Sequence, residues 1–128
     1  MDLTGSALSF RACVYPSPDQ PGYYAAHCLE LDVVGEGKSV EEAMSNLLEV
    51  IETQLESCQD NGAQLLYFAP NDVWQEYNAA KKAGRQIAGE LIERIVRQAN
   101  KRLGHAATNI FDNVVGSNDI PRECLMTA

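Results

Sequence analysis

The 128-residue sequence has no long hydrophobic run, since its uninterrupted stretches of apolar residues span only a few positions. A membrane-spanning helix needs roughly 20 consecutive, mainly apolar residues, so the sequence predicts none. The first ten residues, MDLTGSALSF, also lack the basic segment and the apolar core of a secretory signal peptide. We therefore expect a cytoplasmic protein.

Positive charge is scarce as well. Ten Lys and Arg stand against 18 Asp and Glu, which gives a net charge of -8 at pH 7. Non-specific binding to nucleic acids comes mostly from Lys and Arg that neutralise phosphates, so this balance disfavours it. It favours a basic protein partner instead.

The acidic excess lies in one half of the chain. Residues 1–69 contain two basic and eleven acidic residues, whereas residues 70–128 contain eight basic and seven acidic ones. The change coincides with residues 68–72, FAPND, which favour a break followed by a helix start. We predict an α+β domain over residues 1–69 and a helical extension over residues 70–128.

Paired cysteines are also missing. The four cysteines are far apart and include no CxxC motif, and zinc sites usually draw ligands from such short-range pairs. His27 next to Cys28 is the one close combination. We predict no metal site and no cofactor, and expect the thiols to pack as small hydrophobic groups.

The first half has the pattern of a small sheet with one helix. Alternating apolar and polar residues predict strands over residues 6–15 and 23–31, and short apolar runs predict further strands at 33–34 and 65–68. Ser39 and Glu42 form a capping box in front of an apolar stripe at helical spacing. The predicted fold class is α+β: a small antiparallel sheet in the order β-β-β-α-β, covered by one helix and followed by C-terminal helices.

Residues 22–56, GYYAAHCLELDVVGEGKSVEEAMSNLLEVIETQLE, resemble the N-terminal domain of HicB-type antitoxins. The resemblance lies in the aromatic start of the strand, the short valine strand, the glycine turn, the SVEEA segment and the leucine-rich helix. It implies a partial RNase-H-like fold that lacks the carboxylate set of the nuclease, and therefore a non-enzymatic protein. It further implies a stand-alone HicB-like protein or an antitoxin that occludes a small basic, mRNA-cleaving, HicA-like toxin, if one is encoded nearby. Many family members form oligomers and carry a C-terminal DNA-binding module.

The second half predicts two helices. Asn71 or Asp72 can cap a helix that ends at Gly84, and a second helix covers residues 86–103. From Gly116 onward we expect a mobile tail. The second helix carries an apolar stripe, for which we predict self-association with another copy of the chain. The stripe consists of Ile87, Leu91, Ile92, Ile95 and Val96.

The predicted surface for the basic partner combines aromatic and acidic side chains, because aromatic residues are favoured binding anchors. We do not expect His27 to be catalytic, since a general base needs a nearby nucleophile and an orienting acid. Strand alternation places Glu30 on the opposite face from His27. The candidate partner-binding residues are Tyr23, Tyr24, His27, Glu30, Asp32, Glu49 and Glu52.

Two other functions stay open. A DNA-binding autoregulator would use the cations of the last helix, although these cations also suit the negative end of the helix dipole. A degenerate RNase-H-like hydrolase would need several carboxylates around metal ions, and nothing in the sequence brings Glu30, Asp32 and Glu36 together. The candidate DNA-binding residues are Arg94, Arg97, Lys101 and Arg102.

Overall fold

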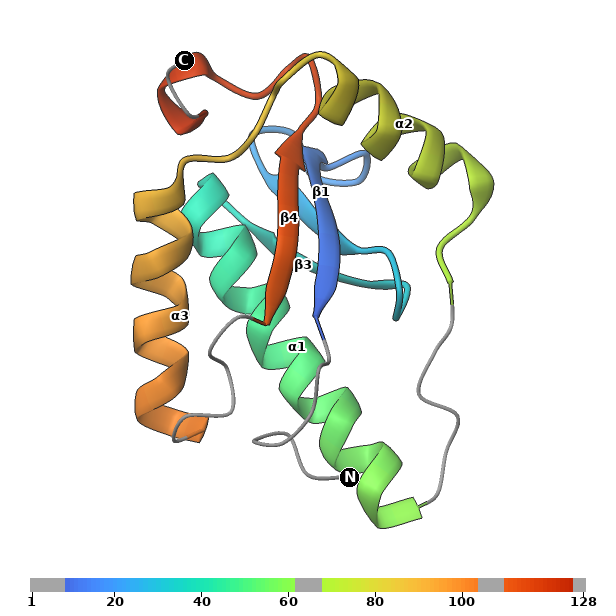
Figure 1. Ribbon diagram of the computed structural model, residues 1–128, viewed down its shortest axis with the longest axis vertical. Helices are drawn as coiled ribbons and strands as arrows, with labels where there is room; N and C mark the ends of the chain where they lie inside the picture. The colour runs from blue at the N-terminus through green and yellow to red at the C-terminus, as the bar shows by residue number, and fades with distance from the viewer. Residues whose placement is uncertain (1–8, 62–67, 104–109, 126–128) are drawn as a thin grey trace.

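The computed structural model of the chain describes residues 9–61, 68–103 and 110–125. Within these ranges, one sheet lies between helices on its two faces, which is an α+β architecture (Figure 1). None of the helices in these ranges combines the length and the apolar character needed to cross a membrane. The elements are β1 (Phe10–Pro16), β2 (Tyr24–Cys28), β3 (Val33–Gly37), α1 (Val40–Asn61), α2 (Asn71–Lys82), α3 (Gly89–Leu103), β4 (Phe111–Gly116) and the 3-10 turn η1 (Arg122–Cys124).

The sheet is mixed and has the strand order β3-β2-β1-β4. β1, β2 and β3 are antiparallel neighbours, with Cys13 opposite His27 and His27 opposite Val34. β4 runs parallel to β1, with Ala12 opposite Val114. The prediction of a purely antiparallel sheet is therefore corrected, because the chain re-enters at the free side of β1 in the same direction as β1.

The fourth strand also comes from a different segment than predicted. It is formed by residues 111–116 and follows two further helices, so the order in the described residues is β-β-β-α-α-α-β. Of the predicted strand at residues 65–68, Phe68 is exposed and lies outside the sheet, and residues 65–67 lie outside the described residues. The predicted class, a small sheet with a covering helix, is confirmed.

α1 covers the inner face of the sheet, to which every second strand residue points. Ala12 and Val14 from β1 and Ala26 and Cys28 from β2 are completely buried there. The predicted apolar stripe of the helix meets them. Its buried residues are Val40, Ala43, Met44, Leu47, Leu48 and Ile51.

The start of α1 follows its sequence signals. The backbone N–H of Glu42 donates to Oγ of Ser39 at 3.1 Å, and the N–H of Lys38 donates to Oε1 of Glu42 at 3.2 Å. Two donors that no helical carbonyl can reach are thereby satisfied.

Gly35 sets the distance between α1 and the sheet. A Cβ on Gly35 would lie 2.6 Å from Cα of Leu47 and 2.7 Å from the carbonyl oxygen of Ala43. Only a residue without a side chain lets the helix backbone approach β3 this closely.

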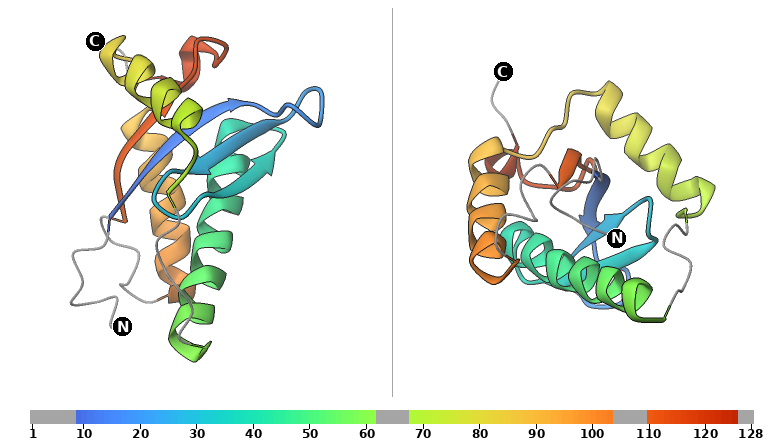
Figure 2. Two further views of the ribbon diagram at one scale, coloured as in Figure 1. Left: turned by 90° about the vertical axis from the view of Figure 1, so that its right-hand side faces the viewer. Right: turned by 60° about the horizontal axis from the view of Figure 1, so that its bottom comes forward.

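α2 lies on the other side of the sheet from α1 and α3 (Figure 2). It packs against β1 and β4, where Tyr77 and Ala80 meet Cys13 and Val115 in a second, smaller core. Asn113 of β4 donates a hydrogen bond from Nδ2 to Oη of Tyr77 at 3.0 Å. This face, opposite α1, is called the outer face below.

α3 packs beside α1 within the same chain (Figure 1). Ile87, Leu91 and Ile95 are buried in the main core, and Ile92 and Val96 are half-buried against it. The chain itself therefore covers most of this stripe, and self-association through it stays a prediction.

The residues after β4 are packed and do not form the predicted mobile tail as far as residue 125. Nε of Arg85 donates to the carbonyl oxygens of Gly116 and Ser117 at 3.2 and 2.9 Å, and Nη2 donates to that of Ile120 at 2.8 Å. Residues 126–128 lie outside the described residues. Because β4 completes the sheet and α3 packs against α1, the predicted division at residue 69 is also corrected.

Candidate functional site

A chain of hydrogen bonds crosses the outer face of the sheet. His27 of β2 is 7% exposed, and its Nδ1 lies 2.9 Å from Oη of Tyr15 in β1. Its Nε2 lies 2.7 Å from Oδ1 of Asp32 in the turn after β2. Asp32 has a φ of 53°, in the left-handed region that Asp tolerates better than most residues. Two strands and one turn therefore position a single polar unit, here called the outer-face hydrogen-bond chain.

The direction of these hydrogen bonds follows from the phenol. The pKa of Tyr15 is raised to about 12, mainly by burial and to a smaller extent by the nearby Cys13 and Asp32. Tyr15 therefore keeps its proton at neutral pH and can donate it to Nδ1 of His27. In a neutral imidazole the other nitrogen, Nε2, then carries the proton and donates it to Asp32. Both ring nitrogens of His27 are thereby occupied.

Three residues at the edge of the sheet, Asp32, Val34 and Glu36, form what we call the β3 rim. Val34 is 38% exposed and lies across the strands from His27. The side chain of Asp32 is 41% exposed, and Glu36 is half-buried and accepts a hydrogen bond from Oγ of Ser17. The rim therefore presents one apolar side chain between two carboxylates.

Two of the predicted partner-binding residues are engaged inside the chain. Tyr24 packs against the inner core. Glu30 is buried, and it accepts hydrogen bonds from the backbone N–H of Arg11 at 2.7 Å and from Nη1 of Arg11 at 2.8 Å. The hydrogen bond between the side chains of Arg11 and Glu30 is the main reason why the pKa of Arg11 is raised. Glu30 is therefore not available to a partner, whereas a partner contact by the half-buried Tyr24 stays a prediction.

The structure separates the remaining predicted residues. Tyr23 is half-buried, and Nζ of Lys38 lies 5.9 Å from the centre of its ring. Glu49 is exposed and Glu52 is half-buried, both on α1, which lies on the opposite side of the sheet from His27. Only His27 and Asp32 of the predicted set come together.

The predicted partner-binding set leaves out Tyr15, Val34 and Glu36, which belong to this surface. Strand alternation alone places Val34 and Glu36 on one face, and the pairing of β1 with β2 then adds Tyr15. A strand prediction extended from residues 33–34 to residues 33–37 would have placed Val34 and Glu36 on the same face of the sheet.

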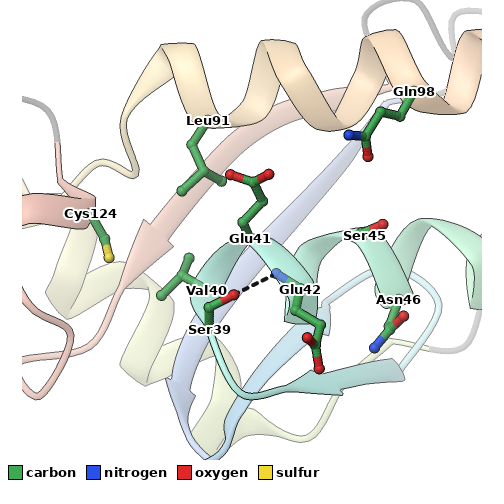
Figure 3. A pocket seen from close by; sticks show the side chains of 9 residues that line it. All are labelled: Ser39, Val40, Glu41, Glu42, Ser45, Asn46, Leu91, Gln98 and Cys124. Atoms are coloured by element: carbon green, nitrogen blue, oxygen red, sulfur yellow. Dashed lines mark hydrogen bonds between the residues drawn. The ribbon is translucent and has the colours of Figure 1, made fainter.

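A hollow of about 480 Å³ lies between the start of α1, α3 and η1. Figure 3 shows Glu41 of α1 pointing toward α3, with Cys124 at one end and Gln98 at the other. Glu41 is the partner of Arg94, whose Nη2 lies 2.6 Å from its Oε1. Of the predicted DNA-binding cations, Arg94 is thus paired with a carboxylate and Arg97 is exposed. The side chains of Lys101 and Arg102 lie outside the described part of the chain.

The thiols of Cys13 and Cys28 are buried, and that of Cys124 is half-buried. Burial raises the pKa of Cys13 and of Cys28 to about 12, and it also raises that of Cys124. These thiols therefore stay protonated at neutral pH and are poor nucleophiles and ligands. No group of three His, Cys, Asp or Glu side chains that could hold a metal ion occurs among the residues that the structure describes.

Comparisons with protein-family models, with curated proteins and with solved structures find no match for this chain. The resemblance in residues 22–56 therefore stays a prediction from the sequence. The function has to be argued from the geometry of the outer face.

Proposed function

We propose that this chain is a non-enzymatic, HicB-like protein of the cytoplasm that binds and neutralises a small basic toxin through the β3 rim. The observation that carries the proposal is the exposed side chain of Val34 between the carboxylates of Asp32 and Glu36. An apolar contact with acidic neighbours suits a partner surface that carries apolar and basic residues.

The folded form of residues 22–56 supports the family part of the proposal. This segment contributes two antiparallel strands and the helix that covers them, and β1 and β4 extend the sheet. The resemblance implies the same elements in the same order. The two helices between α1 and β4 are an addition that the resemblance does not imply.

The state of His27 supports binding over catalysis. A general base needs a nitrogen that can reach the proton it removes. Both nitrogens of His27 are engaged, by Tyr15 and by Asp32, and the residue is almost wholly buried. We propose that the outer-face hydrogen-bond chain stiffens the β3 rim instead of acting on a substrate.

Charge would guide the encounter. The net charge of -8 attracts a basic protein at a distance, and the rim would then fix its orientation. Neutralisation in this proposal is occlusion: the chain covers the surface with which the toxin grips RNA.

The test uses the short basic protein that the proposal expects to be encoded next to this chain. We expect the two to co-purify, and one equivalent of this chain to stop RNA cleavage by the partner. Val34→Lys places a cation on the rim and should weaken binding by about tenfold or more, which is about 1.4 kcal/mol.

Two control variants make this test specific. Val34→Thr keeps the shape of the valine side chain and adds no charge at the rim. Glu49→Lys adds positive charge on the opposite side of the sheet. Both should bind within about twofold of the unchanged chain, because neither puts a cation at the rim. Equal weakening by Glu49→Lys, or an adjacent gene whose product is not a small basic protein, would contradict the proposal.

A further inference from the structure

A pocket of about 460 Å³ opens at the end of the outer face where β1 stops. Three segments far apart in the sequence build it: the end of β1 with the turn after it, the first turns of α2, and the residues that follow β4. Tyr15 lines the pocket and also belongs to the outer-face hydrogen-bond chain, so the two features are continuous.

The wall of the pocket carries negative charge alone. Asp72, Glu76 and Asp119 line it, no Lys or Arg does, and all three carboxylate residues are exposed. Within the described parts of the chain, none of the three makes a hydrogen bond or an ion pair through its side chain. Their negative charge also acts on neighbouring groups. Burial is the main cause of the raised pKa values of Tyr15 and Cys13, but Asp72 raises that of Tyr15 further and Glu76 that of Cys13.

A buried hydroxyl points independently to a ligand. Ser117 lines the same pocket and is 4% exposed, so it belongs to the deep part of the wall. Its Oγ has no hydrogen-bond partner among the residues that the structure describes. A buried polar group without a partner is rare in proteins and calls for an explanation.

The backbone around this hydroxyl is fixed. The N–H of Ser117 donates to the carbonyl oxygen of Val14 at 2.8 Å, and its own carbonyl oxygen accepts from Nε of Arg85 at 2.9 Å. The backbone of Ser117 is therefore held beside the pocket by both of its polar groups, and its hydroxyl is the polar group left to interact.

The other lining groups suit the stem of a long side chain. The ring of Tyr15, Pro16 at the end of β1, Pro18 in the following turn, and Val73 give the pocket an apolar side. A ligand with an aliphatic stem and a cationic head of several N–H donors would use all of these groups together. Arginine has that form, and its planar guanidinium can donate to carboxylates and to a hydroxyl at once.

We propose that this pocket receives an arginine side chain of the basic partner, with the guanidinium among Asp72, Glu76 and Asp119 and with Oγ of Ser117 as a further acceptor. This inference rests on the proposed function, because the arginine belongs to that partner. The pocket would anchor the partner at the end of the same face that the β3 rim contacts at its edge.

The first test titrates the full chain with N-acetyl-arginine amide while amide NMR shifts are recorded. N-acetyl-citrulline amide, which has nearly the same shape without the charge, is the matched ligand. We expect saturable shifts confined to the pocket residues, with a Kd on the order of a millimolar for the arginine compound and at least about tenfold weaker binding for citrulline. Equal binding of both compounds, or shifts spread over the surface, would overturn the proposal.

Variants decide which groups hold the ligand. The double variant Asp72→Asn with Glu76→Gln and the single variant Ser117→Ala should each weaken arginine-amide binding, by about tenfold and about threefold. Glu93→Gln, which changes an exposed carboxylate on α3, should leave it unchanged. Unchanged binding in the double variant would overturn the assignment, and the amide spectra show whether each variant is folded.

The last arm separates this inference from the proposed function. With the basic partner itself, the double variant should lower affinity by about tenfold, as Val34→Lys does. If Val34→Lys weakens the complex and the double variant does not, the pocket assignment fails and the proposed function stands. If the arginine compound binds but no basic protein does, both the proposed function and the assignment to a partner's side chain fail.

Discussion

His27 and Asp32 are five residues apart, yet Nε2 of His27 lies 2.7 Å from Oδ1 of Asp32 because the backbone at Asp32 takes a left-handed turn. Asp32→Ala removes the acceptor and leaves a nearly buried N–H without a partner, so we expect the free energy of unfolding to fall by about 2 kcal/mol. Asp32→Asn keeps an oxygen acceptor and tolerates the positive φ, so its cost should stay near about 1 kcal/mol or below. Urea denaturation measures both values. Equal stability of the two variants would show that the hydrogen bond contributes nothing.

Tyr15 gives the protein a pH dependence on the alkaline side. Its pKa is about 12 in the fold against 10.0 in the unfolded chain. The unfolded state therefore ionises first, so the contribution of Tyr15 to stability is complete below pH 10 and is lost as the pH rises toward 12. We expect stability to fall over this range, and the phenolate absorbance of the native protein to include a late-titrating tyrosine that Tyr15→Phe removes.

Tyr15→Phe is the control for this dependence. Cys13 and Cys28 also have pKa values raised by burial to about 12, and both remain in the variant. The slope of stability against pH should therefore become shallower in Tyr15→Phe without vanishing. An unchanged slope, or the loss of a tyrosine that titrates near its ordinary pKa, would contradict the assignment.

The close approach of α1 to β3 predicts a sharp effect of one methyl group. Gly35→Ala would place a Cβ 2.6 Å from Cα of Leu47, which is backbone and cannot move aside without shifting the helix. We expect a loss of about 3 kcal/mol in the free energy of unfolding, as for overpacked cores. Gly89→Ala is the matched control, since a Cβ there meets nothing within 4 Å at the start of α3. Its stability should equal that of the unchanged chain or exceed it slightly.

The first half of the fold could be predicted because its signals are local. Alternation marks β1 and β2, and the capping box at Ser39 and Glu42 marks the start of α1. β4 could not be predicted as the fourth strand, since its partner β1 lies about a hundred residues away along the chain and neither segment encodes the pairing. The packing of α3 could not be predicted for a related reason: Ile87 and Ile95 are buried in the core beside α1 of the same chain, a contact that no local pattern reveals.

The candidate site could be predicted only where neighbours in sequence are neighbours in space. His27 and Asp32 were both selected, but their hydrogen bond depends on the backbone turn at Asp32. The acidic pocket escaped prediction altogether, because Asp72 and Asp119 converge only after α2 and β4 take their places on the sheet. Glu30 is the opposite case, since an acidic residue near a turn is usually solvated and here it is buried against Arg11.

Arg85 predicts how firmly the end of the chain is held. Its guanidinium donates to the carbonyl oxygens of Gly116, Ser117 and Ile120, and these residues form the bend that leads from β4 to η1. Arg85→Ala removes three hydrogen bonds from a charged donor, and we expect a loss of about 2 kcal/mol together with faster amide hydrogen exchange over residues 117–125. Arg122→Ala, an exposed cation in η1, should change neither quantity. If Arg85→Ala and the unchanged chain had the same exchange rates, backbone hydrogen bonds alone would hold residues 117–125. Ser117 would then keep its place at the pocket without Arg85.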